Sequence, residues 1–240
     1  MIGDSPLARE FWERGKSESC PIYDMHGHMG PLASIYFPRP EARDMLRTMD
    51  ECGVRMLVFS HHMALHSPDV GNRLAVEAVR RYPGRLRAYC SVNPNYPERL
   101  EADLATIEEL IPEVYVGFKF LPDYHGIALT DERYRPAWEY ANERELLVLT
   151  HTWGGSKLDG PEVVRQVAER YPRVKLLLGH SCHGEWDAAG YYVASGGAMA
   201  AATRARTTTA SSWTSSASRR SWKRSVSPRR DPSPARSSSA

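Results

Sequence analysis

Short apolar segments alternate with segments of helical spacing along most of the chain, and this alternation constrains the fold more than any other feature. The apolar segments are residues 22–26, 54–60, 86–92, 114–120, 146–151 and 174–180, and amphipathic stretches such as EARDMLRTMDEC and PEVVRQVAERYP separate them. Short apolar runs without polar alternation are typical of strands buried on both faces. Their alternation with helices predicts βαβ units, a parallel sheet and therefore an α/β fold.

A distinctive residue closes each predicted strand, and these residues are His28, Ser60, Val92, Lys119, His151 and His180. Their regular spacing fits either an open doubly wound sheet or a (β/α)8 barrel. A dinucleotide-binding sheet would carry GxGxxG after its first strand, where this chain has HGHMG. The histidines and the lysine lie at the carboxyl ends of the predicted strands, which is where barrel enzymes keep their active sites, so we expect a TIM-barrel type fold.

The first predicted strand leads into IYDMHGHMG, which places Asp24, His26 and His28 at alternate positions. Alternate residues of a strand face the same side, so we expect these three side chains to point together. Two imidazoles so placed can share one metal ion. The competing interpretation is two histidines of the core or of a loop. The histidines that close the fifth and sixth strands, His151 and His180, favour the metal site.

Four stretches carry a resemblance to a known family: YDMHGHMG, RYPGRLRAYCSVNPNYPERL, VGFKFLPDYHGIALTDERYRPAWEYANERELLVLTHTW and VKLLLGHSCHGEW. Over about residues 20–187, in this order, the chain resembles the amidohydrolase-related (amidohydrolase 2) family of metal-dependent (β/α)8 enzymes. The resemblance implies that His26, His28 and His151 bind one divalent metal, expected to be zinc. It also implies that His180 acts as an acid/base or substrate-polarising group. The last ligand would be an aspartate at the end of an eighth strand.

The activity implied by the resemblance is that of a metal-dependent hydrolase, which cleaves a small organic substrate through metal-activated water. One alternative is the non-oxidative decarboxylation of an aromatic or unsaturated carboxylic acid on the same fold. Another is an inactive, truncated or frameshifted copy that lacks the strand-eight aspartate. Candidate substrate-binding residues are Lys119, Tyr124 and Trp153. Some two-metal relatives carbamylate a lysine at the Lys119 position, but with one metal we expect a structural or substrate-facing lysine.

Several other polar residues lie near the ends of the predicted strands, and we expect structural or surface roles for most of them. Asp24 is expected either to orient an imidazole or to be structural. Ordinary surface positions are expected for His61, His62, His125 and Lys157. The HSCH spacing at residues 180–183 resembles a metal motif but is interpreted as accidental, because these side chains would leave the strand end in different directions.

Composition predicts a cytoplasmic protein without a membrane-spanning segment. No run of eighteen apolar residues occurs, and the charged start MIGDSPLAREFWERGK lacks the apolar region of a signal peptide. The four cysteines are far apart and are expected to be free thiols.

The last forty residues differ sharply in composition from the rest. Residues 201–240 contain 12 Ser, 8 Arg, 7 Ala and 5 Thr, with nine Lys/Arg against one Asp, whereas the whole chain has a net charge of only +2. Such a segment cannot bury a core and predicts disorder. We therefore expect a partial barrel over residues 1–195 and a low-complexity tail over 196–240. Nucleic-acid binding by this basic tail is disfavoured, because the body is acidic.

A frameshift would explain why no seventh and eighth strands can be identified in the tail. Suppose that the reading frame over SSWTS and SWKRSV is moved back by one base in GC-rich DNA. The shifted codons then encode apolar residues, Asp and Glu where a strand and a helix are expected. The alternative is a genuine tail. With six strands, the first and last would have unpaired edges, which predicts marginal stability and association into a homo-oligomer.

Overall fold

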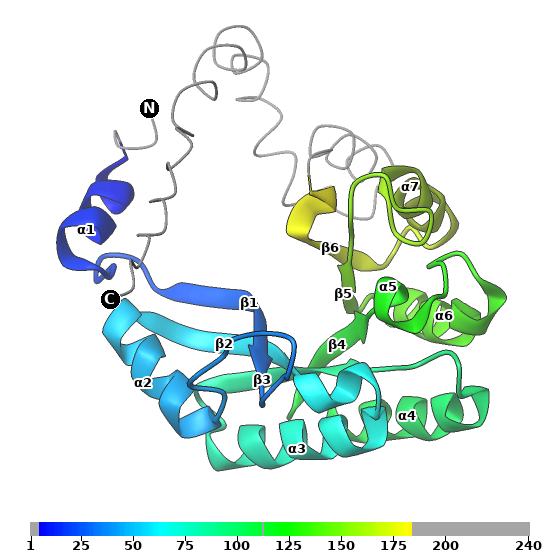
Figure 1. The fold of residues 1–240 in the computed structure, drawn as a ribbon, viewed down its shortest axis with the longest axis horizontal. Helices are drawn as coiled ribbons and strands as arrows, with labels where there is room; N and C mark the ends of the chain where they lie inside the picture. The colour runs from blue at the N-terminus through cyan, green and yellow to red at the C-terminus, as the bar shows by residue number, and fades with distance from the viewer. Residues whose placement is uncertain (1–4, 112, 184–240) are drawn as a thin grey trace, which may run out of the picture. The chain divides into compact units, whose positions relative to one another are not determined.

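A computed structural model describes residues 5–111 and 113–183, so the predicted tail and the expected seventh and eighth strands lie outside the described residues. Six strands form one parallel sheet in chain order. They are β1 (Ile22–Met29), β2 (Val54–His61), β3 (Leu86–Ser91), β4 (Tyr115–Phe120), β5 (Leu147–His151) and β6 (Lys175–Gly179). The sheet curls like part of a barrel (Figure 1), which confirms the prediction of an α/β, barrel-type fold.

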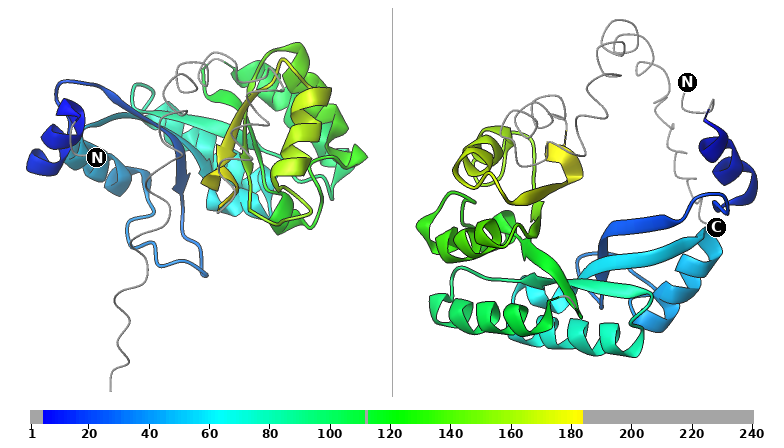
Figure 2. Two further views of the ribbon diagram at one scale, coloured as in Figure 1. Left: turned by 90° about the horizontal axis from the view of Figure 1, so that it is seen from above. Right: turned by 180° about the vertical axis from the view of Figure 1, so that it is seen from behind.

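The helices that connect the strands lie along the outer side of the curled sheet (Figures 1 and 2). They are α2 (Ala42–Cys52), α3 (Pro68–Arg81), α4 (Pro97–Leu110), α6 (Arg135–Glu143) and α7 (Pro161–Arg170), with α1 (Pro6–Arg14) before the sheet. Shorter helical turns are η2 (His62–Leu65), α5 (Pro122–His125), η3 (Glu132–Tyr134) and η4 (His180–Cys182). Several helices begin at proline, whose fixed φ suits the first helical position. Among the described residues, no helix is long and apolar enough to cross a membrane.

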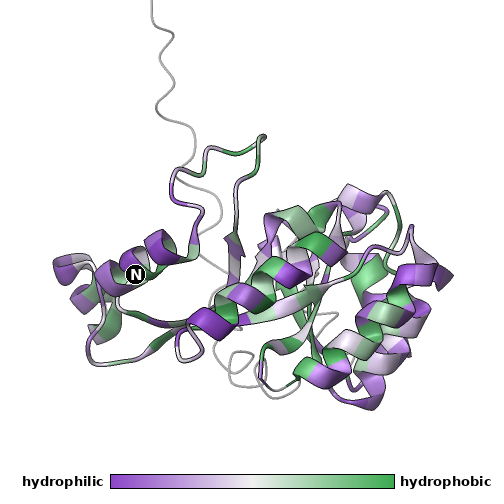
Figure 3. Cartoon of the chain, turned by 90° about the horizontal axis from the view of Figure 1, so that it is seen from below, coloured by the Kyte–Doolittle hydropathy of each residue, from purple (hydrophilic) through white to green (hydrophobic). Residues whose placement is uncertain are grey.

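Two apolar layers hold the sheet in place. The outer and larger layer packs strand residues such as Phe59 and Phe118 against helix residues such as Trp138. The inner layer, on the opposite face of the sheet, is centred on Val58 and Leu149 together with Tyr89. Polar and apolar residues both run along each helix in Figure 3, as expected for helices with one face on the sheet.

A one-residue bulge interrupts the alternation of side chains in β1. Asp24 pairs with Leu57 of β2 and Gly27 pairs with Phe59, so two residues of β1 oppose one residue of β2. Two hydrogen bonds between side chains and the backbone hold the bulge. The Asp24 Oδ1 accepts a hydrogen bond from the backbone N–H of His26 at 3.0 Å, and the Tyr89 hydroxyl donates to the Met25 carbonyl at 2.9 Å. The bulge is therefore a built feature that re-aims the second half of the strand.

A second register shift lies in β4 and helps to aim Lys119 at the inner face. Ala88 pairs with Tyr115, but the next residue, Tyr89, pairs with Gly117. Gly117 has φ +154, and a Cβ at this position would lie 1.9 Å from the Leu147 carbonyl oxygen. Glycine is therefore required where the two strands approach most closely.

Replacing Asp103 with asparagine is expected to stabilise the protein at pH 7.5 by about 1–2 kcal/mol. Asp103 on α4 is 5% exposed, and burial raises its pKa from 3.8 to about 6. A raised carboxyl pKa means that stability present below pH 3.8 is lost as pH rises toward 6. Urea unfolding should therefore show a gain for Asp103→Asn at pH 7.5 that shrinks as the pH falls toward 4. Asp50→Asn, at an exposed ion pair, is the control, and an equal gain for Asp103→Asn at both pH values would contradict the explanation.

Candidate active site

Four imidazoles from three strands lie together at the carboxyl ends of the sheet. His26 and His28 belong to β1, His151 closes β5 and His180 follows β6. The ring centroids of His26 lie 5.4 Å from those of both His28 and His180, and the centroids of His151 and His180 are 4.7 Å apart. The structure thus brings together the four histidines predicted for the site. We refer to these four residues as the imidazole centre.

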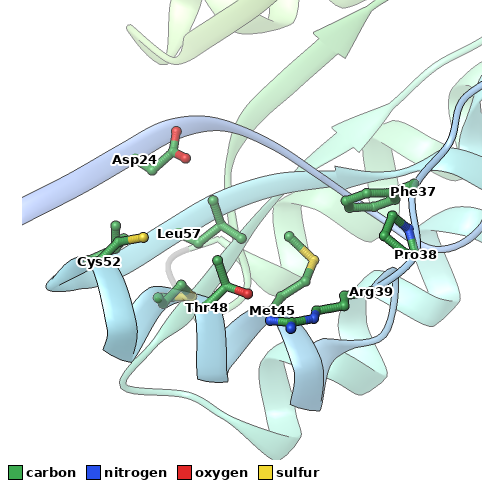
Figure 4. A pocket seen from close by; sticks show the side chains of 10 residues that line it. Asp24, Phe37, Pro38, Arg39, Met45, Thr48, Cys52 and Leu57 are labelled. Carbon is green, nitrogen blue, oxygen red and sulfur yellow. The ribbon is translucent and has the colours of Figure 1, made fainter. Parts of the chain in front are cut away.

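Asp24 does not face the imidazole centre. It lies on the α2 side of β1, in a pocket of about 380 Å³ that Phe37, Met45 and Leu57 also line (Figure 4). The prediction that Asp24, His26 and His28 point together is wrong, because the bulge adds one residue and reverses the alternation. Its hydrogen bond to the backbone N–H of His26 makes Asp24 a structural carboxylate that holds the bulge.

The ring of His28 is held from two sides. Its Nδ1 lies 3.2 Å from the Ser60 Oγ at the end of β2, and its ring stacks on that of His62 at 4.9 Å. The His62 Nδ1 is in turn 2.6 Å from the Gly30 carbonyl oxygen. With Nδ1 engaged, the other ring nitrogen of His28, Nε2, remains for a ligand. Supporting contacts of this kind orient metal-binding imidazoles.

Two histidines expected at the surface are buried instead. His62 is 6% exposed and supports His28, while His125 is 9% exposed. The Nε2 of His125 lies 2.8 Å from the Leu65 carbonyl oxygen, and its Nδ1 lies 3.3 Å from the Tyr134 hydroxyl. The surface interpretation failed for both because the strand-end loops fold back over the sheet and give each ring a polar partner.

Lys119 reaches the imidazole centre from β4. Its side chain is almost fully buried, with 1% exposure, and its Nζ lies 3.5 Å from the His26 Nε2. Burial lowers the pKa of Lys119 to about 7, so the neutral amine and the ammonium are both accessible near neutral pH. The prediction placed this lysine at the site, and the structure puts it in contact with a proposed ligand.

His151 connects the imidazole centre to an open, aromatic pocket. Its Nε2 lies 3.3 Å from the Asp123 Oδ2, its ring is parallel to that of Trp153 with centroids 6.0 Å apart, and Tyr124 meets it edge-on at 5.7 Å. These four residues line a pocket of about 350 Å³. Tyr124 and Trp153, predicted as substrate-binding candidates, therefore both lie next to a proposed ligand.

Two carboxylates near His151 were missed by the sequence analysis. Ligand atoms of Asp123, His151 and Asp159 all lie within 4.8 Å of one another. Burial raises the pKa of Asp159 to about 6. Only their positions in the loops that follow β4 and β5 could have pointed to these aspartates, since no motif surrounds them.

The HSCH segment does not form a metal site of its own in the described residues. Cys182 is fully buried and belongs to the outer apolar layer. His183 stacks on the Trp153 ring at 4.3 Å. The side chains of this segment therefore go to different surroundings, as the sequence analysis expected.

Burial keeps the ligand imidazoles neutral at physiological pH. It lowers the pKa of His26 and of His151 to about 4 and that of His28 to about 2, and the Lys119 charge contributes to each shift. A neutral imidazole offers a lone pair, as metal binding requires. Neutral imidazole nitrogens are donors that suit a divalent cation such as zinc or manganese.

A curled parallel sheet with imidazoles at its carboxyl edge has the architecture of barrel enzymes. The sequence pattern of the amidohydrolase family matches residues 23–227, and the chain belongs to that family. No curated protein matches the chain in sequence.

Solved structures similar to the chain share its fold at low identity. A 2,6-dihydroxybenzoate decarboxylase complexed with 2,6-dihydroxybenzoate is 15% identical with a TM-score of 0.51, over 69% of this chain and 67% of that one. A manganese-bound dihydroxybenzoic acid decarboxylase from Polaromonas sp. JS666 is 16% identical with a TM-score of 0.53, over 73% and 68%. An uncharacterised TIM-barrel protein from Bordetella bronchiseptica is 17% identical with a TM-score of 0.52, over 63% and 55%. These likenesses confirm the barrel-type fold.

Replacing Gly179 with alanine is expected to lower metal affinity about 10-fold, a size typical of changes that move a ligand. A Cβ at Gly179 would lie 2.9 Å from the His26 Cε1 and 2.9 Å from the Thr150 carbonyl oxygen, so the His26 ring must move. Gly84→Ala is the matched control, because a Cβ there meets nothing within 4 Å. Competition with a chelator measures both variants, and unchanged affinity in Gly179→Ala would contradict this geometry.

Proposed function

We propose that the protein is a metal-dependent hydrolase that acts on a small organic substrate. The observation that carries this proposal is the imidazole centre, in which His26 lies beside His28 and His180 lies beside both His26 and His151, with a buried lysine next to His26. Zinc is the proposed ion, since it favours nitrogen ligands. When bound, it would supply the Lewis acidity that makes water a nucleophile near neutral pH or polarises a substrate oxygen.

The residues around the imidazole centre are proposed to transfer protons, stabilise charge and contact the substrate. His180 lies beside His26 and His151 and is exposed, so it can transfer protons to or from a bound substrate. Lys119 offers a buried N–H donor close to the His26 Nε2, where developing negative charge would be stabilised. Tyr124 and Trp153 provide flat apolar walls on the open side of His151.

A second candidate function is the non-oxidative decarboxylation of an aromatic carboxylic acid. The aromatic residues beside His151 favour it, because Tyr124 and Trp153 both line the open pocket next to this imidazole, where either can contact a planar ring. Two of the similar structures are decarboxylases of dihydroxybenzoates, which is consistent with this alternative. In this reaction His180 would deliver a proton to the ring carbon that loses carbon dioxide.

One assay panel tests both functions. The full chain is loaded with Zn²⁺ or Mn²⁺ and incubated with hydroxybenzoates, lactones and amides, while carbon dioxide release and hydrolysis are measured. Metal-dependent hydrolysis supports the main proposal, and carbon dioxide release supports the second. If neither product forms in the metal-loaded chain while His26 and His28 still bind metal, the chain is an inactive member of its family.

The remaining properties proposed for the chain concern its partners and location. We propose a cytoplasmic enzyme with a small-molecule substrate that associates through the edges of β1 and β6, the outer strands of the described sheet. Light scattering coupled to size-exclusion chromatography measures the association, and a cooperatively melting monomer would contradict it.

A further inference from the structure

A second group of metal-type donors combines His151 with two aspartates from neighbouring loops. It consists of Asp123 in α5, which follows β4, and Asp159 in the loop before α7, together with the His151 ring between the two loops. Each residue offers one donor atom, and these atoms lie within 4.8 Å of one another. We refer to Asp123, His151 and Asp159 as the carboxylate group.

Asp159 is the unusual member of the carboxylate group. It has 0% exposure, and neither oxygen of its carboxylate makes a hydrogen bond of good geometry among the described residues, although Ser156 and the Trp153 backbone lie near enough to oppose the rise that burial causes in its pKa. A buried carboxylate without a partner is strongly unfavourable. One of these oxygens lies within 4.8 Å of a donor atom of Asp123 and one of His151, so a cation placed there would satisfy it.

The surrounding loop holds the two carboxylates close together. The Ser156 Oγ donates to the Asp123 Oδ1 at 3.3 Å and accepts from the backbone N–H groups of Leu158 and Asp159 at 3.1 and 3.3 Å. Ser156 therefore ties the α5 segment to the loop that carries Asp159. Two carboxylates held so near each other repel unless a proton or a cation lies between them.

We propose that Asp123, His151 and Asp159 form a second site for a divalent cation, separate from the imidazole centre. Two carboxylates and one imidazole suit Mn²⁺ or Zn²⁺, and the open pocket beside Asp123 leaves room for water ligands. The site rests on the proposed function only in that it shares His151 with it.

The shared imidazole couples the two sites. A neutral imidazole has one lone pair, and its tautomer decides which ring nitrogen carries it. When Nε2 carries the proton and donates to Asp123, Nδ1 is free for the imidazole centre. When Nδ1 carries the proton, Nε2 is free for the cation held by the two aspartates. Filling one site therefore weakens the other, and excess metal is expected to inhibit the enzyme.

Binding of Mn²⁺ to the chelator-treated full chain tests the proposal, with free Mn²⁺ measured by electron paramagnetic resonance. The wild-type chain should show two classes of site. Asp159→Asn, which preserves shape, and Asp123→Asn, at an exposed position, should each weaken one class by roughly 100-fold and leave the other. Asp50→Asn, at a surface ion pair far along the sequence, is the matched control and should keep both classes.

The outcomes separate this inference from the proposed function. If both aspartate variants, checked for folding by circular dichroism, bind Mn²⁺ like the wild type, the second site does not exist. In the double variant His26→Asn/His28→Asn the class that needs the aspartates should persist, because His151 and both carboxylates remain. If that double variant still shows both classes of Mn²⁺ site, the proposed function is overturned, whereas the second site stands.

Discussion

Replacing His28 with asparagine is expected to lower the affinity for a divalent cation by about 100-fold. The His28 ring is held through Nδ1 by Ser60 and through its face by His62, so its Nε2 remains available to a ligand. Asparagine keeps a polar side chain in the same strand but is too short to replace Nε2. Competition with a chelator of known affinity, followed for Zn²⁺ and Mn²⁺, measures the loss.

A control variant separates this effect from a general loss of histidine. His66 is exposed and lies outside the imidazole centre, so His66→Asn should bind metal like the wild type. If His28→Asn retains wild-type affinity with its fold intact, then His28 is not a ligand and the centre must be assigned differently.

Replacing Lys119 with methionine is expected to lower kcat/KM by about 100-fold, on whichever substrate the assay panel identifies, while metal affinity stays near its wild-type value. Methionine keeps the unbranched apolar stem of lysine, one atom shorter, but removes the donor next to the His26 Nε2. A carbamylated Lys119 bridging two metals predicts the opposite, because metal would then be lost together with activity. Lys175→Met, at the exposed start of β6, is the control.

Much of the fold was predictable because the repeated pattern is strong. The apolar segments around Phe59, Phe118 and Leu149 lie on both faces of the sheet, and such strands leave a clear signal in the sequence. The convergence of His26, His28, His151 and His180 followed from the same pattern, since parallel strands bring their carboxyl ends to one edge.

What the sequence did not reveal depends on contacts between distant residues. The bulge in β1 follows from the pairing of Asp24 with Leu57 and of Gly27 with Phe59, and no local composition marks an extra residue in a strand. The carboxylate group escaped notice for a similar reason. Asp123 and Asp159 become neighbours only because the loops after β4 and β5 meet at His151.

The bulge divides β1 into two parts that can vary independently. The part up to Asp24 packs beside α2, whereas His26 and His28 lie in the imidazole centre, and the extra residue between the parts lets each keep its own orientation. Substitutions around Asp24 that accommodate a changed α2 therefore need not turn the imidazoles, provided that Asp24 itself is kept to hold the bulge. A lineage carrying this strand is free to alter its outer helices while it conserves the imidazole centre.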